Sequence, residues 1–518
     1  LWQAGEEDDA RHYLAATVYA FAFLFPDEDG TGLDPYDPRT RVAADIYNRA
    51  LVRAMLDGEG EYFAPRAGDF PMPAGEVRVR FDESDLDWNG HRLSDLEPVG
   101  ELRVEGIRNR YRRPGLGAPL AARPAPPDDT YRDEDLVGPN IRVPVAAVLE
   151  LDAPRAQLRG KAPLEATLAL YASEDEETIE IGDRSVRLES EPTVVLASSL
   201  KSSRVWETEF SSFLGSAVQF KEKPTLLRAL EPCERGRIPV VFVHGTASSV
   251  FRWTDMVNDL QNDPDVRHRF QFWFYTYDSG APIAYSSFHL RRLLEIQVAA
   301  CDPEGTDAAL QSMVVIGHSQ GGLLTKMTVI DSGDRFWNAI SRRPFDEVRL
   351  DAETRELLRG ALFVEPLPFV SRVVFISTPH RGSYLAGPQF VRRLAQRLIR
   401  FPRDVVGVGA ALSGLSSRGD LYLDARTMPT SIDNMSPGHP FIRTLASIPV
   451  DPRVEVHSII PVRELGDLAN GDDGVVKYSS AHIEPVASEL VVHDSHSTQA
   501  NPVTVEEVRR ILRLHAGL

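Results

Sequence analysis

Residues 311–324 read QSMVVIGHSQGGLL, and this stretch decides the fold that the sequence predicts. An apolar, β-branched run ends at Gly317, a serine follows, and two glycines open an amphipathic helix. Gly317-x-Ser319-x-Gly321 is the pattern of a nucleophile elbow, a strand-to-helix turn so sharp that its serine adopts a strained backbone. A Cβ atom at either glycine would collide with the neighbouring strand or helix. The pattern predicts that the turn lifts the Ser319 hydroxyl above the sheet edge, at a helix N-terminus.

Strands and helices alternate on both sides of this stretch. Residues 238–243 form a continuous apolar run, which is typical of a parallel strand covered on both faces. Further strands are expected at 270–275, 313–316, 373–377, 454–460 and 489–492, with helices at 287–300, 323–330 and 505–514. The alternation predicts an α/β fold with a doubly wound, mostly parallel sheet over residues 226–518. Ligands bind such sheets at the carboxyl ends of the strands, where Ser319 lies.

A serine hydroxyl is a weak nucleophile, so it needs a base, and the base needs a group that orients it. In this fold the order along the chain is nucleophile, acid, histidine. His496 lies in the loop after the last strand and is the predicted base, with His493, at the end of that strand, as the alternative. His482 follows the acid candidates too closely, and His515 lies too late, in the terminal helix.

The acid should follow the strand at 454–460. Asp473 directly precedes Gly474 and two valines and is the predicted acid, and Asp472 is its rival. Either aspartate could instead be a turn residue that satisfies its own backbone.

Acyl transfer also needs two amide donors for the developing oxyanion, one after the nucleophile and one from the loop after an early strand. The candidates are Gln320 and Thr246, with Ala247 as the alternative to Thr246.

Five segments and His496 together resemble bacterial lipases and esterases of the α/β-hydrolase superfamily. The segments are VHGT at 243–246, YDSGAPI at 277–283, GHSQGG at 317–322, STPHRGS at 377–383 and DGVV at 473–476. The resemblance covers residues 230–518, in the expected order. It implies hydrolysis of carboxylic esters through a Ser319–His496–Asp473 triad and an acyl-enzyme on Ser319.

Two insertions, at about 331–370 and 382–445, are longer than a crossover needs and predict a helical cap. In the second, apolar side chains that include Phe390 and Leu394 alternate with arginines on a helical period. We expect His318, Phe390 and Leu394 to contact the substrate.

The first 225 residues carry no comparable motif. Residues 1–75 are expected to be a helical region, in which 11–55 predict a helical hairpin with small residues at the helix crossing. Residues 76–225 predict a small β-rich, sandwich-like module of short alternating strands. The segment from Pro114 to Pro127 is expected to be a proline-rich link. A protein partner for the N-terminal region is one hypothesis, and simple docking of the hairpin on the next domain is the other.

Charge and cysteine content limit the classes of function. The formal net charge of −19 argues against nucleic acid or anionic membrane as partner. No metal or other cofactor is expected, because two cysteines and scattered histidines provide no ligand cluster. Cys233 and Cys301 are expected either to pair or to be buried thiols.

The apolar run at 13–25 is too short to span a bilayer. The chain begins at Leu1, so we expect that a preceding segment was removed. An exported or cell-envelope location is compatible with this, but the remaining sequence does not indicate export, and the localisation is left open.

These observations favour a serine carboxylic ester hydrolase that acts on a small-molecule or lipid-like ester. The alternatives are a polyester depolymerase, thioesterase or amidase with the same residues, or a scaffold protein whose hydrolase activity is secondary.

Overall fold

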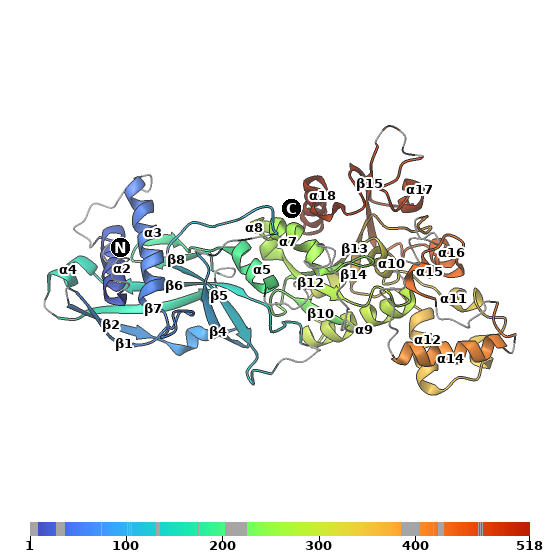
Figure 1. The fold of residues 1–518 in the computed structure, drawn as a ribbon, viewed down its shortest axis with the longest axis horizontal. Coiled ribbons are helices and arrows are strands. Elements are labelled where there is room, and N and C mark those ends of the chain that lie inside the picture. The colour runs from blue at the N-terminus through green and yellow to red at the C-terminus, as the bar shows by residue number, and fades with distance from the viewer. Residues whose placement is uncertain are drawn as a thin grey trace. The chain divides into compact units, whose positions relative to one another are not determined.

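The computed structural model describes two compact units (Figure 1). Unit 1 consists of Leu1–Arg132 and Val137–Phe210, and unit 2 of Asp133–Leu136 and Ser211–Leu518. The described residues are 9–26, 37–73, 75–100, 102, 104, 106–130, 135–160, 162–172, 176–201, 225–384, 403–417, 419–422, 429–464, 466, 468 and 470–518.

Unit 1 is built on a seven-stranded sheet in the order β1-β2-β7-β6-β5-β4-β3. Its strands are β1 (Gly68–Met72), β2 (Gly75–Phe81), β3 (Asp87–Trp88), β4 (His91–Pro98), β5 (Ala118–Ala125), β6 (Val143–Leu151) and β7 (Leu164–Ala172). Neighbouring strands are antiparallel except for β2 and β7, which are parallel. The short strands β8 (Thr178–Ile181) and β9 (Arg184–Arg187) form a separate ribbon.

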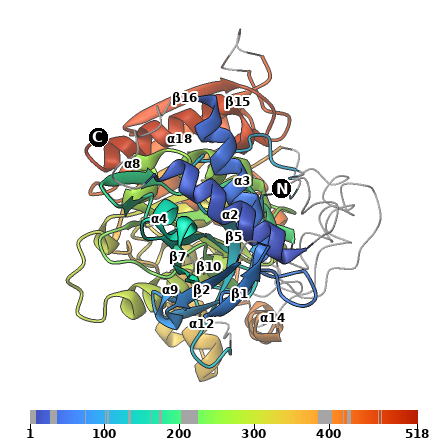
Figure 2. The ribbon, with the colours of Figure 1, turned by 90° about the vertical axis from the view of Figure 1, so that its left-hand side faces the viewer.

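Helices α2 (Ala10–Leu24) and α3 (Pro38–Ala54) pack side by side and cover one face of this sheet (Figure 2). The buried hydroxyl of Tyr47 donates to the carbonyl of Leu149 and accepts from the amide of the same residue, at 2.8 and 2.7 Å. The helical hairpin is therefore docked on the strands through hydrogen bonds as well as apolar packing.

Helix α5 (Pro192–Lys201) covers the opposite face. Side chains alternate along β5, so that Leu120 packs with α2 and α3 while Ala121 packs with Val194 and Val195 of α5. In the described residues of unit 1, helices rather than a second large sheet cover the central strands. The predicted sandwich-like packing is thus replaced by one sheet between helices.

Strand β5 corrects the prediction of a proline-rich link at 114–127. Although Pro119 and Pro124 lack amide donors, β5 pairs with both β4 and β6. The carbonyl of Pro119 still accepts from the amide of Val99 at 3.1 Å. Burial of Leu120 and Ala122 favours the strand where the proline signal predicted a linker.

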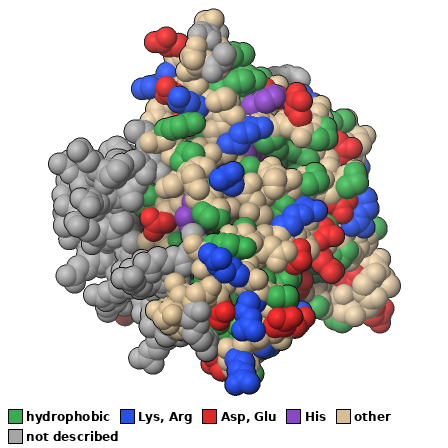
Figure 3. Space-filling model, turned by 90° about the vertical axis from the view of Figure 1, so that its right-hand side faces the viewer, with side chains coloured by type: hydrophobic (Ala, Val, Ile, Leu, Met, Phe, Trp, Pro, Cys, Tyr) green, Lys and Arg blue, Asp and Glu red, His purple; other side chains and the backbone are tan. Residues whose placement is uncertain are grey.

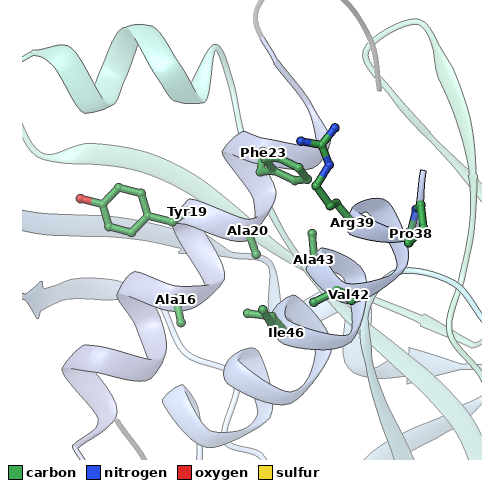
Figure 4. A pocket seen from close by; sticks show the side chains of 9 residues that line it. All are labelled: Ala16, Tyr19, Ala20, Phe23, Pro38, Arg39, Val42, Ala43 and Ile46. Carbon is green, nitrogen blue, oxygen red and sulfur yellow. The ribbon is translucent and has the colours of Figure 1, made fainter. Parts of the chain in front are cut away.

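The outer sides of α2 and α3 leave an apolar groove of about 590 Å³ between the two helices (Figure 4). Tyr19 and Val42, at its edge, are 51% and 56% exposed. A protein partner for this region stays a prediction.

Unit 2 contains a mixed, mostly parallel sheet in the order β10-β12-β11-β13-β14-β15-β16. The strands are β10 (Leu226–Ala229), β11 (Ile238–Val243), β12 (Phe270–Thr276), β13 (Met313–His318), β14 (Val370–Ile376), β15 (Glu455–Val462) and β16 (Ser488–His493). Edge strand β10, which was not among the predicted strands, is antiparallel to β12, and the other pairs are parallel.

Alternate residues of these strands point into two apolar cores, because successive side chains of a strand face opposite sides. Val241 and Val315 pack with α9 (Ile283–Cys301) and α10 (Gln320–Lys326). Phe242 and Ile316 pack with α7 (Thr254–Gln261), α8 (Pro264–Arg269) and α18 (Pro502–His515). The sheet is covered on both faces, which explains why its strands read as continuous apolar runs.

The two insertions contribute further helices, namely α11 (Arg335–Asn338), α12 (Ala352–Leu362), α14 (Arg403–Ser417), α15 (Ser431–Asn434) and α16 (Pro440–Ser447). Helix α12 contacts both α9 and α14, and α11 contacts α16. This side of unit 2 carries interspersed basic, acidic and hydrophobic side chains (Figure 3). A role for these helices as a cap stays a prediction.

Cys233 and Cys301 form a disulfide with their Cα atoms 5.9 Å apart. It links the segment before β11 to the last residue of α9, and of the two expectations for these cysteines the paired state holds. Among the described helices, none is long and apolar enough to cross a membrane.

A cluster of two histidines around Arg372 lies at the amino-terminal ends of β14 and β15. The guanidinium group donates to Nε2 of His457 and to Nδ1 of His515, the latter at 2.9 Å. The remaining ring nitrogens donate to Ser488 Oγ and to the carbonyl of Ser312, both at 2.7 Å. Each imidazole must therefore be neutral, because it accepts from a permanent cation.

We expect the free energy of unfolding to fall as the pH is lowered from about 6.5 toward 4. Burial, and then Arg372, lower the pKa of His457 from 6.5 to about 4. The unfolded chain therefore binds a proton at His457 in this window that the folded chain does not. The stability that the neutral His457 contributes is fully present above the window and is lost as the pH falls through it. One such proton is worth about 1.4 kcal/mol per pH unit.

Urea unfolding across this window should show that the free energy of unfolding depends less steeply on pH in His457→Gln than in the wild type. The difference in slope should correspond to at most one proton. The control is Ser497→Ala, a change at an exposed residue that does not titrate, which should retain the wild-type slope. Equal slopes for His457→Gln and the wild type would show that His457 is not the source of this pH dependence.

Candidate active site

Ser319 lies between β13 and α10, in the turn that the glycine pattern predicts. Its backbone is strained, at φ 55° and ψ −123°. A Cβ atom at Gly321 would lie 2.2 Å from the carbonyl oxygen of Val243, and one at Gly317 would lie 2.4 Å from Thr325 Oγ1. The Cβ atom at Gly317 would also lie 2.5 Å from the carbonyl oxygen of Gly321, and because real Cβ atoms do not approach other atoms this closely, the strand, turn and helix can meet here only with glycine at both positions.

A hydrogen-bonded chain runs from Ser319 through His496 to Asp473. Ser319 Oγ lies 2.8 Å from His496 Nε2, and His496 Nδ1 lies 2.7 Å from Asp473 Oδ2. A carboxylate accepts only, so Nδ1 carries the imidazole proton and Nε2 is left as the acceptor of the serine hydroxyl. This is the arrangement that can remove a proton from Ser319.

Asp473 is held on both carboxylate oxygens. Oδ1 accepts from the amides of Val475 and Val476, at 2.8 and 2.7 Å, while Oδ2 faces His496. The residue is 3% exposed, and its carbonyl accepts from the amide of His496 at 3.0 Å. These contacts fix the carboxylate so that one oxygen is directed at the imidazole.

The rival residues have other partners. Asp472 forms an ion pair with Arg463 and accepts from the amide of Gly474 at 2.7 Å. His493 is exposed and contacts the carbonyl of Arg463 through Nε2 at 2.7 Å. The structure therefore brings Asp473 and His496, rather than these neighbours, to Ser319.

The amides proposed for the oxyanion come from the start of α10 and from the loop after β11. Gln320 begins α10, so its amide has no acceptor within the helix. The Thr246 hydroxyl donates to Gln320 Oε1 at 2.6 Å, which ties the two donor segments together. The amide of Ala247, the alternative, donates to Ser279 Oγ at 3.0 Å. Between Ala247 and Thr246, the amide of Ala247 has an acceptor among the described residues, and the amide of Thr246 has none there.

His318, one of the predicted substrate contacts, is directed inward. The residue is 4% exposed, and Nε2 lies 2.9 Å from the carbonyl oxygen of His496. Phe390 and Leu394, the other predicted contacts, lie outside the described residues.

Ser377 was not singled out as a site residue by the sequence analysis. It follows β14, has φ 53°, and donates from Oγ to the carbonyl of His496 at 3.0 Å. The available signal was its position, directly after a buried parallel strand and therefore at the same sheet edge as Ser319. Among the described residues, no three His, Cys, Asp or Glu side chains gather as ligands of a metal ion.

Comparisons with known proteins give similar structures only. No family model matches the chain, and no curated protein matches it. The mature lipase BlEst2 of Bacillus licheniformis is 15% identical with a TM-score of 0.33, and the match covers 56% of this chain and 98% of that one. Staphylococcus hyicus lipase is 15% identical with a TM-score of 0.35, and the match covers 54% of this chain and 95% of that one. EstA from Clostridium botulinum is 13% identical with a TM-score of 0.34, and the match covers 60% of this chain and 98% of that one. These structural neighbours are bacterial lipases and esterases.

Proposed function

We propose that unit 2 is a serine hydrolase of carboxylic esters. The observation that carries the proposal is the unbroken hydrogen-bond chain from Ser319 Oγ through His496 to Asp473, at 2.8 and 2.7 Å. A hydroxyl, a neutral imidazole and a buried carboxylate in this order form a nucleophile with its base and the group that orients the base.

In the proposed reaction His496 Nε2 takes the proton of Ser319 as Oγ attacks the ester carbonyl. The amides of Gln320 and Thr246 donate to the oxyanion that forms, and Asp473 stabilises the imidazolium. His496 then gives its proton to the leaving alcohol, and an acyl-enzyme remains on Ser319. Water then attacks this ester as His496 takes its proton, and His496 returns that proton to Ser319 Oγ as the acyl–Oγ bond breaks and the acid is released.

An uncharged substrate is favoured by the polar groups next to Ser319. Apart from the His496–Asp473 pair, the described hydrogen-bond partners in this part of the site are the neutral groups of Thr246, Gln320 and Ser279. These neutral donors and acceptors match a neutral ester, and burying a charged acyl group beside them without an ion pair would be costly. We therefore propose a neutral, small-molecule or lipid-like ester as substrate.

The test combines turnover with covalent labelling. p-Nitrophenyl esters from acetyl to palmitoyl should be hydrolysed, and a p-nitrophenyl phosphonate should inactivate the enzyme with one phosphonyl group on Ser319, as read by peptide mass spectrometry. Matched thioester and anilide substrates distinguish a thioesterase or amidase, and a polyester film distinguishes a depolymerase.

Labelling of another serine with loss of activity, or full turnover after Ser319 is labelled, would contradict the proposal. Faster turnover of the thioester or the anilide than of the matched ester would assign the same residues to a different substrate class.

A further inference from the structure

The main-chain carbonyl of His496 accepts two side-chain hydrogen bonds, from His318 Nε2 at 2.9 Å and from Ser377 Oγ at 3.0 Å. We propose that His318 and Ser377 are positioning residues, which hold His496 where its imidazole meets the hydroxyl of Ser319. We call this pair of donors the carbonyl clamp. The inference rests on the proposed function, because it assigns a purpose to the location of the base.

Ser377 reaches the carbonyl by way of a strained backbone. Its φ of 53° lies in the left-handed region, which a residue with a side chain rarely adopts without compensation. The amide of Ser377 donates to the carbonyl of Ile459 on the neighbouring strand at 3.0 Å, which holds the residue at the sheet edge. Strain of this kind persists where the surroundings enforce it, commonly at functional sites.

The ring of His318 is held in one orientation and one tautomer. Because Nε2 donates to a carbonyl, it carries the proton, and Nδ1 is then a bare acceptor with no partner among the described residues. The ring contacts the indole of Trp253 edge-on and packs beside the imidazole of His496. Burial lowers the pKa of His318 to about 3, so the ring keeps this neutral form at neutral pH.

The bond from Nε2 is what distinguishes the His318 ring from an apolar side chain of similar size. A buried nitrogen without a partner costs about 1–3 kcal/mol, whereas a phenylalanine would fill similar space without that cost. At this position the ring offers one polar contact that phenylalanine lacks, the bond to the carbonyl of His496.

The clamp connects the base to the nucleophile through rigid elements. His318 directly precedes Ser319 in the chain, and Ser377 follows the adjacent strand β14. His496, in contrast, comes from the loop after β16, a strand that does not pair with β13. With its amide bonded to the carbonyl of Asp473, His496 is anchored at both main-chain polar groups. Its position relative to Ser319 is thereby set by the sheet edge rather than by its own loop.

The experiment compares His318→Phe, Ser377→Ala and the double variant with the wild type on a p-nitrophenyl ester. A displacement of the base of about 1 Å can cost on the order of 100-fold in rate. We expect each single variant to lose about 10-fold in kcat and the double variant about 100-fold, with KM changed little. The rate of phosphonylation of Ser319 should fall in parallel, because it requires the same base.

Two further variants separate positioning from general damage. His318→Gln retains an N–H donor at a similar reach and should restore most of the activity. His380→Phe is the matched control, since His380 is equally buried in the same unit and neither of its ring nitrogens has a partner among the described residues. It should keep the wild-type kcat, and urea midpoints of all variants would show which of them fold.

Wild-type kcat in the folded double variant, together with an inactive Ser319→Ala, would overturn the clamp and leave the proposed function intact. A loss in His380→Phe as large as that in His318→Phe would also overturn it, because the effect would then be general. Full activity of Ser319→Ala would instead overturn the proposed function. If His318→Phe does not fold, the test is the comparison of Ser377→Ala, which should lose kcat, with His318→Gln, which should keep most of it.

Discussion

Ser319→Ala is expected to lower kcat for p-nitrophenyl esters by about 10⁶-fold, the loss that follows removal of the nucleophile in a comparable serine enzyme. The alanine methyl group cannot form the acyl-enzyme, and His496 Nε2 loses the hydroxyl that lies 2.8 Å away. KM should change far less than kcat, because the groups that would bind the ester are unaltered.

Steady-state rates and phosphonate labelling would measure this effect. Ser497→Ala, an exposed serine in the loop that carries His496, is the control and should retain wild-type turnover. Equal loss in both variants, or full activity in Ser319→Ala, would refute Ser319 as the nucleophile.

Asp473→Asn is expected to lower kcat by about 10⁴-fold, through the tautomer of His496. The amides of Val475 and Val476 would hold the remaining oxygen of the asparagine in the place of Oδ1. Its NH₂ group would then face His496 Nδ1 as a donor. The imidazole would have to carry its proton on Nε2, where it could no longer accept the proton of Ser319.

Asp472→Asn is a sharp control for this prediction, because it makes the same chemical change one residue away. Asp472 is bonded to Arg463 and not to the imidazole, so its variant should keep kcat within about 2-fold of the wild type, the scale of a surface ion pair. A larger loss in Asp472→Asn than in Asp473→Asn would contradict the assignment of the acid.

The fold of unit 2 was largely predictable because its signals are local. Residues 238–243 and 313–316 are apolar throughout, and such runs indicate strands that helices cover on both faces. The glycines at 317 and 321 identified the turn, because their need for close backbone contact can be read from the pattern.

Unit 1 was less predictable because its packing overrides local propensity. Pro119 and Pro124 indicated a linker, yet the buried apolar residues between them form a central strand. Short alternating strands also cannot indicate whether a second sheet or a pair of helices covers them. Tyr47 forms a hydrogen bond with Leu149, 102 positions away, and this contact helps to dock the helices on the sheet. No local sequence pattern predicts such a contact.

The sequence by itself determined the order of the candidate catalytic residues along this chain. A strained serine lies between a buried strand and a helix, and it is followed by a loop with aspartates and then by a loop with histidines. These are consequences of backbone sterics and hydrophobic periodicity, which act over a few residues. The tertiary structure alone decided which aspartate and which histidine reach Ser319, that Cys233 pairs with Cys301, and that His318 and Ser377 share the carbonyl of His496. Each of these depends on a distance of a few ångströms between atoms far apart in the chain, and such distances are set by packing of the sheet edge rather than by any stretch of sequence.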